Sequence, residues 1–243
     1  MKYITAFLCI LLTASIVNAG KTVNYQVDGQ SFEGYIESPS KDAPLVLLIH
    51  DWDGLTDYER KRAAMLAELG YNVFAIDLFG AGVRPTKVED KRQHTGKLYA
   101  DREKMRRLLK GGIQAAESNG VSTESMVAAG YCFGGAAVLE LARSGADLKG
   151  FVTFHGGLGT PEGQDYSAAR GSYLILHGSS DTAITLDQLA ALGVQLEKNN
   201  LPHELVSYGG APHAFTVFGS DRYREDADKK SWKRFTNFLK EVL

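Results

Sequence analysis

One cysteine lies in a glycine-framed turn between a short apolar run and an Ala/Leu-rich run. Residues 126–142 contain Gly-Tyr-Cys-Phe-Gly-Gly, with Cys132 at the junction of a predicted strand and a predicted helix. This pattern is typical of a nucleophile elbow, a sharp turn that lifts one side chain above the end of a sheet. A Cβ atom at position 130 or 134 would crowd such a turn. Cys132 is therefore a candidate nucleophile, and its alternative role is that of a buried structural cysteine.

A thiol reacts as the thiolate, which needs a base nearby, and the base needs a carboxylate to orient it. Asp181 follows a predicted strand over residues 173–177, and His213 follows a predicted strand over residues 203–208. The chain order of nucleophile, acid and histidine is one of the known triad orders. Each candidate lies in a loop after a separate predicted strand. The sequence thus predicts a triad of Cys132, Asp181 and His213.

Other residues compete for the roles of base and acid. His155 lies at the same predicted rim of the sheet and stays a candidate pocket residue. His177 ends a predicted strand, which favours a core position, and His203 begins a strand at the opposite rim. Asp187 is the rival acid, but it falls within a predicted helix.

The N-terminal 19 residues differ from the rest of the chain. Lys2 precedes an apolar run over residues 4–17, and Val17-Asn18-Ala19 forms a small-x-small cleavage site. This pattern predicts a secretory signal peptide, because the run is shorter than the roughly 20 residues that span a bilayer. The alternatives are an uncleaved anchor or a buried first helix. Cleavage would leave Cys132 as the sole cysteine, unable to form an internal disulfide. We expect an exported protein, periplasmic or secreted.

Composition points to one globular domain over residues 20–243. The chain has 243 residues, is 44% hydrophobic, and carries 27 basic against 29 acidic side chains. Without a basic block, neither nucleic acid nor an anionic membrane is an expected partner. We expect a monomer that acts on a small molecule, without stable membrane insertion after cleavage. The histidines form no metal-ligand pair, and no phosphate or dinucleotide loop is present, so we expect no metal and no cofactor.

Strands and helices are predicted to alternate along the chain. This alternation predicts a doubly wound, mostly parallel sheet, and Asp28-Gly29 predicts an antiparallel N-terminal hairpin. Ligands bind at the carboxyl ends of such strands, so Asp51, Trp52 and the predicted triad should share one rim. The predicted strands cover residues 23–27, 31–36, 45–50, 72–76, 126–129, 150–154, 173–177 and 203–208, and the predicted helices cover residues 57–69, 98–118, 134–143, 186–199 and 226–243.

Four segments together resemble the dienelactone hydrolase family of α/β-hydrolases. They are the elbow at residues 130–135, His177-Gly178 with Asp181, residues 212–215 around His213, and residues 50–55. The resemblance covers essentially the whole chain after residue 19. It implies an α/β-hydrolase fold and a Cys-His-Asp triad that hydrolyses small esters or lactones.

Further site residues follow from this resemblance. An oxyanion hole is expected from the backbone N–H groups of Phe133 and Trp52. Asp51 stands where the family usually has a Glu that contacts the thiol, so it either tunes the thiol or only holds its loop. Family members that cleave lactones have a basic residue shortly after the histidine, whereas residues 214–218 contain none. Arg84 either replaces it or is only solvated.

The sequence therefore favours an exported, cofactor-free cysteine hydrolase that cleaves small carboxylic esters or lactones through an acyl-enzyme. The nearest alternatives are a thioesterase or a peptidase of the same fold. A non-catalytic ligand-binding protein on the same scaffold is the alternative from another class.

Overall fold

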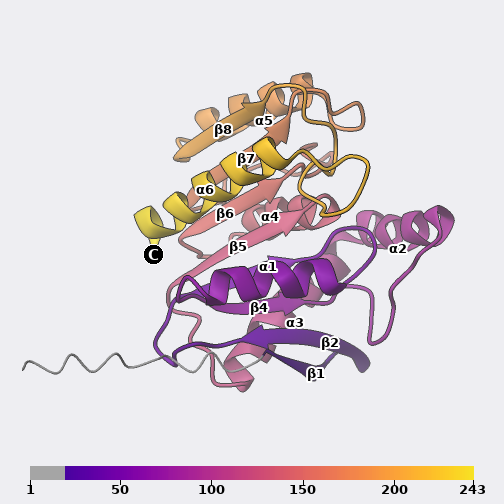
Figure 1. The fold of residues 1–243 in the computed structure, drawn as a ribbon, viewed down its shortest axis with the longest axis vertical. Coiled ribbons are helices and arrows are strands. Elements are labelled where there is room, and N and C mark those ends of the chain that lie inside the picture. Colours follow the sequence, from indigo (N-terminus) through magenta and orange to yellow (C-terminus); the bar gives the residue numbers. More distant parts are fainter. Residues whose placement is uncertain (1–19) are drawn as a thin grey trace, which may run out of the picture.

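The computed structural model describes residues 20–243 and contains one eight-stranded sheet in the order β1-β2-β4-β3-β5-β6-β7-β8 (Figure 1). The predicted signal peptide, residues 1–19, lies outside the described residues. The strands are β1 (Lys21–Val27), β2 (Gln30–Glu37), β3 (Leu45–Ile49), β4 (Asn72–Ile76), β5 (Met126–Tyr131), β6 (Gly150–Phe154), β7 (Ser172–Gly178) and β8 (His203–Tyr208).

Strand direction follows the prediction. β1 pairs antiparallel with β2, and β2 pairs antiparallel with β4, whereas all pairs from β4 to β8 are parallel. The doubly wound, mostly parallel sheet with an antiparallel N-terminal hairpin is therefore confirmed. Asp28 and Gly29 connect β1 to β2 with φ angles of 51° and 76°, as a tight hairpin turn requires.

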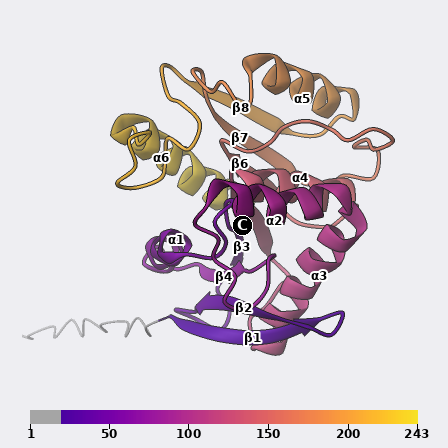
Figure 2. The same ribbon diagram turned by 90° about the vertical axis from the view of Figure 1, so that its right-hand side faces the viewer.

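Helices cover both faces of the sheet, as Figure 2 shows. Residues of α1 and α6 pack on one face, and residues of α3, α4 and α5 pack on the other. The helices are α1 (Asp57–Ala67), α2 (Val88–Ala100), α3 (Arg102–Ser118), α4 (Phe133–Arg143), α5 (Leu186–Lys198) and α6 (Glu225–Val242).

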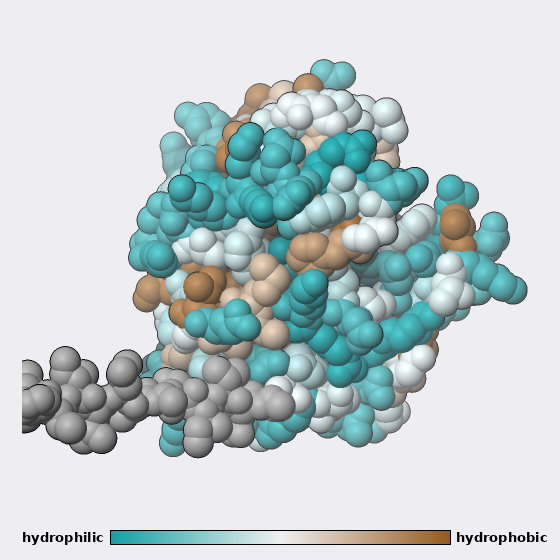
Figure 3. Space-filling view, in the orientation of Figure 1, coloured by the Kyte–Doolittle hydropathy of each residue, from teal (hydrophilic) through white to brown (hydrophobic). Residues whose placement is uncertain are grey.

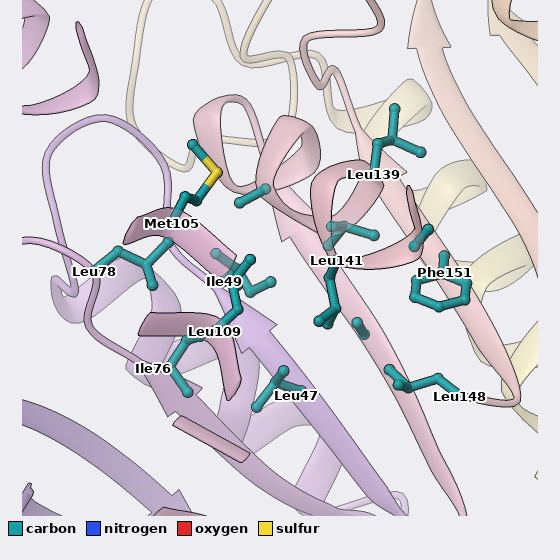
Figure 4. Close-up of a cluster of buried hydrophobic side chains, with 14 of the residues drawn as sticks. Leu47, Ile49, Ile76, Leu78, Met105, Leu109, Leu139, Leu141, Leu148 and Phe151 are labelled. Atoms are coloured by element: carbon teal, nitrogen blue, oxygen red, sulfur yellow. The ribbon is translucent and has the colours of Figure 1, made fainter. Parts of the chain in front are cut away.

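The central strands are apolar on both faces because both faces are covered. In β3, Leu45, Leu47 and Ile49 point to the cluster under α3 and α4, whereas Val46 and Leu48 point to the cluster under α1 and α6. All five side chains have no exposed surface. Figure 4 shows part of the first cluster, where strand and helix side chains meet. This two-sided burial explains the continuous aliphatic runs in the sequence.

The predicted helix over residues 98–118 is wrong at its N-terminal end. Two helices occupy this region, because the chain turns at Asp101 (φ −120°, ψ 80°), whose side chain accepts a hydrogen bond from the Lys104 N–H and starts α3. Leu98 belongs to the last turns of α2, a helix that the sequence did not predict. Only Thr95 and Leu98 of α2 are buried, so it lacks the apolar repeat that identifies a core-facing helix.

The surface in Figure 3 is largely hydrophilic, with apolar patches of small extent. Among residues 20–243, no helix combines the length and the apolar character that crossing a bilayer requires.

Candidate active site

The turn between β5 and α4 holds Cys132 in a backbone conformation that side chains rarely adopt. Its φ of 50° and ψ of −111° lie outside the usual regions, at a cost of about 1–3 kcal/mol. The Cys132 N–H donates to the Phe154 carbonyl (3.0 Å), and its carbonyl accepts from the N–H groups of Gly135 (3.1 Å) and Gly157 (3.3 Å). These hydrogen bonds hold the strained residue at the carboxyl end of the sheet.

The glycines of the turn allow two backbone segments to touch. A Cβ atom on Gly130 would lie 2.3 Å from the backbone of Gly134. A Cβ atom on Gly134 would lie 2.3 Å from the carbonyl oxygen of Ile49 and 2.5 Å from that of His50. All three distances are too short for a real side chain, which confirms the steric expectation for positions 130 and 134. The start of α4 therefore rests directly on the end of β3.

His213 and Asp181 complete a continuous chain of hydrogen bonds that ends at the thiol. The Nε2 atom of His213 lies 3.1 Å from Cys132 Sγ, and its Nδ1 atom lies 2.8 Å from Asp181 Oδ2. The other carboxylate oxygen of Asp181 accepts from the N–H groups of Ala183 and Ile184, both at 2.9 Å. The Asp181 carboxylate is thus held on both oxygens and orients the imidazole toward the sulfur.

The groups hydrogen-bonded to His213 favour the protonated form of its ring, an imidazolium. Burial opposes a charge on His213, but its hydrogen bonds to Asp181 and Cys132 outweigh burial and raise its pKa to about 10. Burial also opposes ionisation of Asp181, but the bonds from His213 and Ile184 prevail and lower its pKa below the ordinary value. An ionised acid beside a protonated histidine can stabilise a thiolate on the other side of the ring.

The loops that carry Asp181 and His213 are hydrogen-bonded to each other. The Ser180 N–H donates to the Ala211 carbonyl (3.0 Å), and the Gly210 N–H donates to Ser179 Oγ (2.8 Å). These bonds join the loop after β7 to the loop after β8. The acid and the base therefore keep a fixed spacing that does not depend on their own hydrogen bond alone.

His155 supports the ring of His213 rather than lining the cavity. It is fully buried with a φ of 41°, and its ring centre lies 5.4 Å from the His213 ring centre in an edge-to-face arrangement. Its Nε2 atom lies 2.8 Å from Thr216 Oγ1, in the loop that carries His213. Burial lowers the pKa of His155 well below its ordinary value, so it is a neutral neighbour.

A buried arginine ties the same loop to two helices. Arg62 of α1 is 1% exposed, donates to the Thr216 carbonyl (2.9 Å), and pairs with the carboxylate of Asp228 in α6. Its guanidinium lies against the aromatic rings of Tyr58, Tyr131, Phe218 and Trp232. The position of the His213 loop is thereby tied to the body of the fold.

A cavity of about 290 Å³ opens above the thiol. This volume suits a small organic molecule. Its lining combines the predicted nucleophile and base with two arginines that the sequence did not indicate. The lining residues are Asp51, Trp52, Arg92, Cys132, Ala183, His213, Ala214 and Arg222.

The structure brings Trp52 to the cavity and Phe133 directly after the thiol-bearing residue, at the start of α4. Within residues 20–243, the backbone N–H groups of Trp52 and Phe133 have no hydrogen-bond acceptor. The Phe133 side chain itself is buried against Tyr99 and Phe79. Two N–H donors without an acceptor among residues 20–243 thus belong to a residue that lines the cavity with Cys132 and to the residue that follows Cys132.

Asp51 lines the cavity without a hydrogen bond to the thiol. Its Oδ1 atom accepts from the Asp53 N–H (3.0 Å), so the carboxylate holds its own loop. Burial raises the pKa of Asp51 well above the ordinary value, and the carboxylates of Asp53 and Glu59 add to this effect. Of the two roles left open by the sequence, the contacts match loop stabilisation, although Asp51 and Cys132 line one cavity.

Arg84 does not line the cavity. Its guanidinium donates to the carbonyl oxygens of Leu55 and Val83 and pairs with Glu33 (3.1 Å). Arg92 and Arg222 line it instead. Arg92 lies in α2, a helix that the sequence does not predict, and Arg222 lies nine residues after His213, beyond residues 214–218.

The rival residues occupy structural positions. His177 is buried, and its Nε2 donates to the Ile184 carbonyl (3.0 Å), which braces the Asp181 loop. His203 begins β8, and its Nδ1 lies 2.8 Å from the Leu201 carbonyl. Asp187 lies in the first turn of α5.

Replacing Asp181 by Asn should lower the pKa of His213 from about 10 toward the ordinary value of about 6.5. The substitution removes the negative charge that stabilises the imidazolium but keeps the shape of the side chain. A titration of the His213 ring resonances by NMR measures the change. Asp187→Asn is the matched control and should leave the titration unchanged; equal titrations of Asp181→Asn and the unsubstituted protein would contradict the assignment.

Comparisons with known proteins agree with this geometry. The model of the dienelactone hydrolase family matches residues 32–243. A structure named m3DLH is 30% identical, covers 93% of this chain and 100% of its own, and superposes with a TM-score of 0.86. A dienelactone hydrolase-like promiscuous phosphotriesterase from metagenomic libraries is 28% identical, covers 92% and 98% of the two chains, and has a TM-score of 0.84.

A curated relative from Saccharolobus solfataricus is provisionally named a carboxymethylenebutenolidase. It is 25% identical over 91% of this chain and 98% of its own. The family model covers nearly all of the described residues, including the loops that carry Cys132, Asp181 and His213. The two solved structures share the α/β-hydrolase fold of this chain. The chain therefore belongs to the dienelactone hydrolase family.

Proposed function

We propose that this protein hydrolyses small carboxylic esters or lactones through a covalent acyl-enzyme on Cys132. The observation that carries the proposal is the continuous chain from Asp181 through His213 to Cys132, with contacts of 2.8 Å and 3.1 Å. The relative from Saccharolobus solfataricus, provisionally named a carboxymethylenebutenolidase, supports a lactone or ester as substrate.

The proposed reaction has two halves. Cys132 Sγ attacks the carbonyl carbon, and the carbonyl oxygen becomes an oxyanion that the N–H groups of Phe133 and Trp52 stabilise. His213 then gives its proton to the leaving alkoxide, which departs as the alcohol and leaves a thioester. In the second half, His213 takes a proton from water as the water attacks the thioester. Collapse of this intermediate releases the acid and restores the thiolate and imidazolium.

We also propose that the substrate carries a negative charge. Arg92 and Arg222 line the same cavity as Cys132, both are exposed, and neither forms an ion pair within residues 20–243. Guanidinium groups bind carboxylates well. This arrangement supplies the positive charge that Arg84, engaged elsewhere, does not bring to the cavity.

Export stays a proposal that rests on the sequence of residues 1–19. Mass spectrometry of the protein recovered from cells in which it is expressed with its full leader measures the N-terminal residue. We expect Gly20 at the N-terminus, and a chain that keeps residues 1–19 after export would contradict cleavage.

The nucleophile is tested with a panel of an activated ester, a thioester and a lactone. Cys132→Ala should lower kcat/KM for the ester by at least about 10³-fold, because the acyl-enzyme cannot form. Mass spectrometry should detect the acyl group on Cys132 with a slow substrate, and circular dichroism should confirm that the variant is folded. Full activity in Cys132→Ala would refute the proposal, and the preferred substrate of the panel separates esterase from thioesterase activity.

Substrate charge is tested with two esters of equal size, one bearing a carboxylate and one a carboxamide. The double substitution Arg92→Gln and Arg222→Gln should raise KM for the carboxylate ester about 5- to 30-fold, as expected for the loss of two exposed charge contacts. The carboxamide ester should be unaffected. Lys240→Gln removes an exposed charge in the last turn of α6 and serves as the control. Equal effects on the two esters would contradict charge recognition.

A further inference from the structure

His50 makes two hydrogen bonds that fix which of its ring nitrogens carries the proton. It follows β3 directly and has no exposed surface. Its Nε2 atom accepts from the N–H of Leu78 (3.0 Å), and its Nδ1 atom lies 2.6 Å from the carbonyl oxygen of Asp51. A backbone N–H can only donate, so Nε2 carries no proton. The proton is therefore on Nδ1, which donates to the Asp51 carbonyl.

The surroundings keep this tautomer. Burial lowers the pKa of His50 to about 4, which outweighs the opposing effect of the bond to Asp51. The nearest carboxylate oxygen, Asp77 Oδ1, lies 3.9 Å from Nε2, too far for a hydrogen bond. The rings of Phe79 and Phe133 pack against the imidazole, with centres 4.7 Å and 6.1 Å away. The ring thus has one orientation and one donor.

The carbonyl that His50 holds belongs to the same peptide unit as the Trp52 N–H. A peptide unit is planar, and all peptide bonds in the described residues are trans, so its C=O and N–H point in opposite directions. Fixing the Asp51 carbonyl therefore fixes the direction of the Trp52 N–H. That N–H has no acceptor within residues 20–243, and Trp52 lines the cavity with Cys132.

We propose that His50 is a positioning residue for the oxyanion hole: by donating to the Asp51 carbonyl, it aims the Trp52 N–H at the oxyanion that forms above Cys132. This inference rests on the proposed function. His50 is fully buried and is not among the residues that line the cavity. Its effect falls on the chemical steps rather than on substrate binding, because the carbonyl oxygen gains negative charge only in the tetrahedral intermediate and in the transition states that lead to and from it.

Three substitutions separate the two hydrogen bonds of His50. His50→Leu removes both. His50→Gln offers an acceptor at the position of Nε2 and can keep the bond from Leu78. His50→Asn offers an N–H donor at the position of Nδ1 and can keep the bond to the Asp51 carbonyl. Removal of a whole oxyanion donor lowers kcat by roughly 10²- to 10³-fold. A Trp52 N–H that is present but no longer held in one orientation should therefore lower kcat by roughly 10- to 100-fold.

The experiment compares ester hydrolysis with alkylation of Cys132 by iodoacetamide in the same variants. Alkylation forms no oxyanion, so it reports the thiolate and the fold alone. We expect kcat to fall roughly 10- to 100-fold in His50→Leu and His50→Gln with little change in KM, and His50→Asn to keep kcat within a few-fold. The alkylation rate should stay unchanged in all three variants.

The outcomes that contradict the role of His50 differ from the outcome that contradicts the proposed function. A parallel fall of alkylation and hydrolysis would assign His50 to the thiol or to the fold and overturn the inference, as would equal losses in His50→Asn and His50→Leu. A protein without substitutions that is alkylated at Cys132 but hydrolyses nothing in the panel would refute the proposed function instead.

If the protein hydrolyses none of the panel substrates, the role of His50 can still be tested by a measurement that needs no turnover. A short aliphatic aldehyde adds to the thiolate and places an oxygen where the oxyanion would form. The amide resonance of Trp52 should then shift in the unsubstituted protein and in His50→Asn but not in His50→Leu. Aldehyde addition without any shift at Trp52 would overturn the inference.

Discussion

The direct backbone contact between the start of α4 and the end of β3 is the constraint on which the site depends. No side chain fits between Gly134 and the carbonyl oxygens of Ile49 and His50. This contact brings the first residue of α4, Phe133, and the loop after β3, which carries Trp52, to the same end of the sheet as Cys132. The strained turn at Cys132 follows from it, because the chain must reverse within a few atoms of a neighbouring strand.

Burial and hydrogen-bond partners together shift the pKa values of His50 and His213 in opposite directions. Burial disfavours the charged form of both rings, but only His213 has a carboxylate in hydrogen-bond contact. His213 therefore takes up a proton readily, whereas His50 stays neutral and serves as a fixed donor. The difference lies in the partners of the two rings, which are a carboxylate and a thiol for His213 and two backbone groups for His50.

The sheet and the three residues of the hydrogen-bonded chain could be predicted because each depends on a local pattern. Buried strands read as aliphatic runs, and parallel strands bring the residues that follow them to one rim. The helix α2 could not be predicted, since its stability comes from few buried side chains and from contacts made by the folded chain. The positions of Arg92 and Arg222, and the tautomer of His50, depend on how distant segments meet, and no spacing in the sequence encodes that.

The sparse burial of α2 has a consequence for how this family can diverge. The buried residues of α2 are Thr95 and Leu98, whereas its Arg92 is exposed and lines the cavity. Substitutions on the exposed side of α2 can alter what enters the cavity at small cost to folding, whereas the elbow tolerates almost none. Selection for new substrates can therefore act on α2 without changing the elbow that holds Cys132.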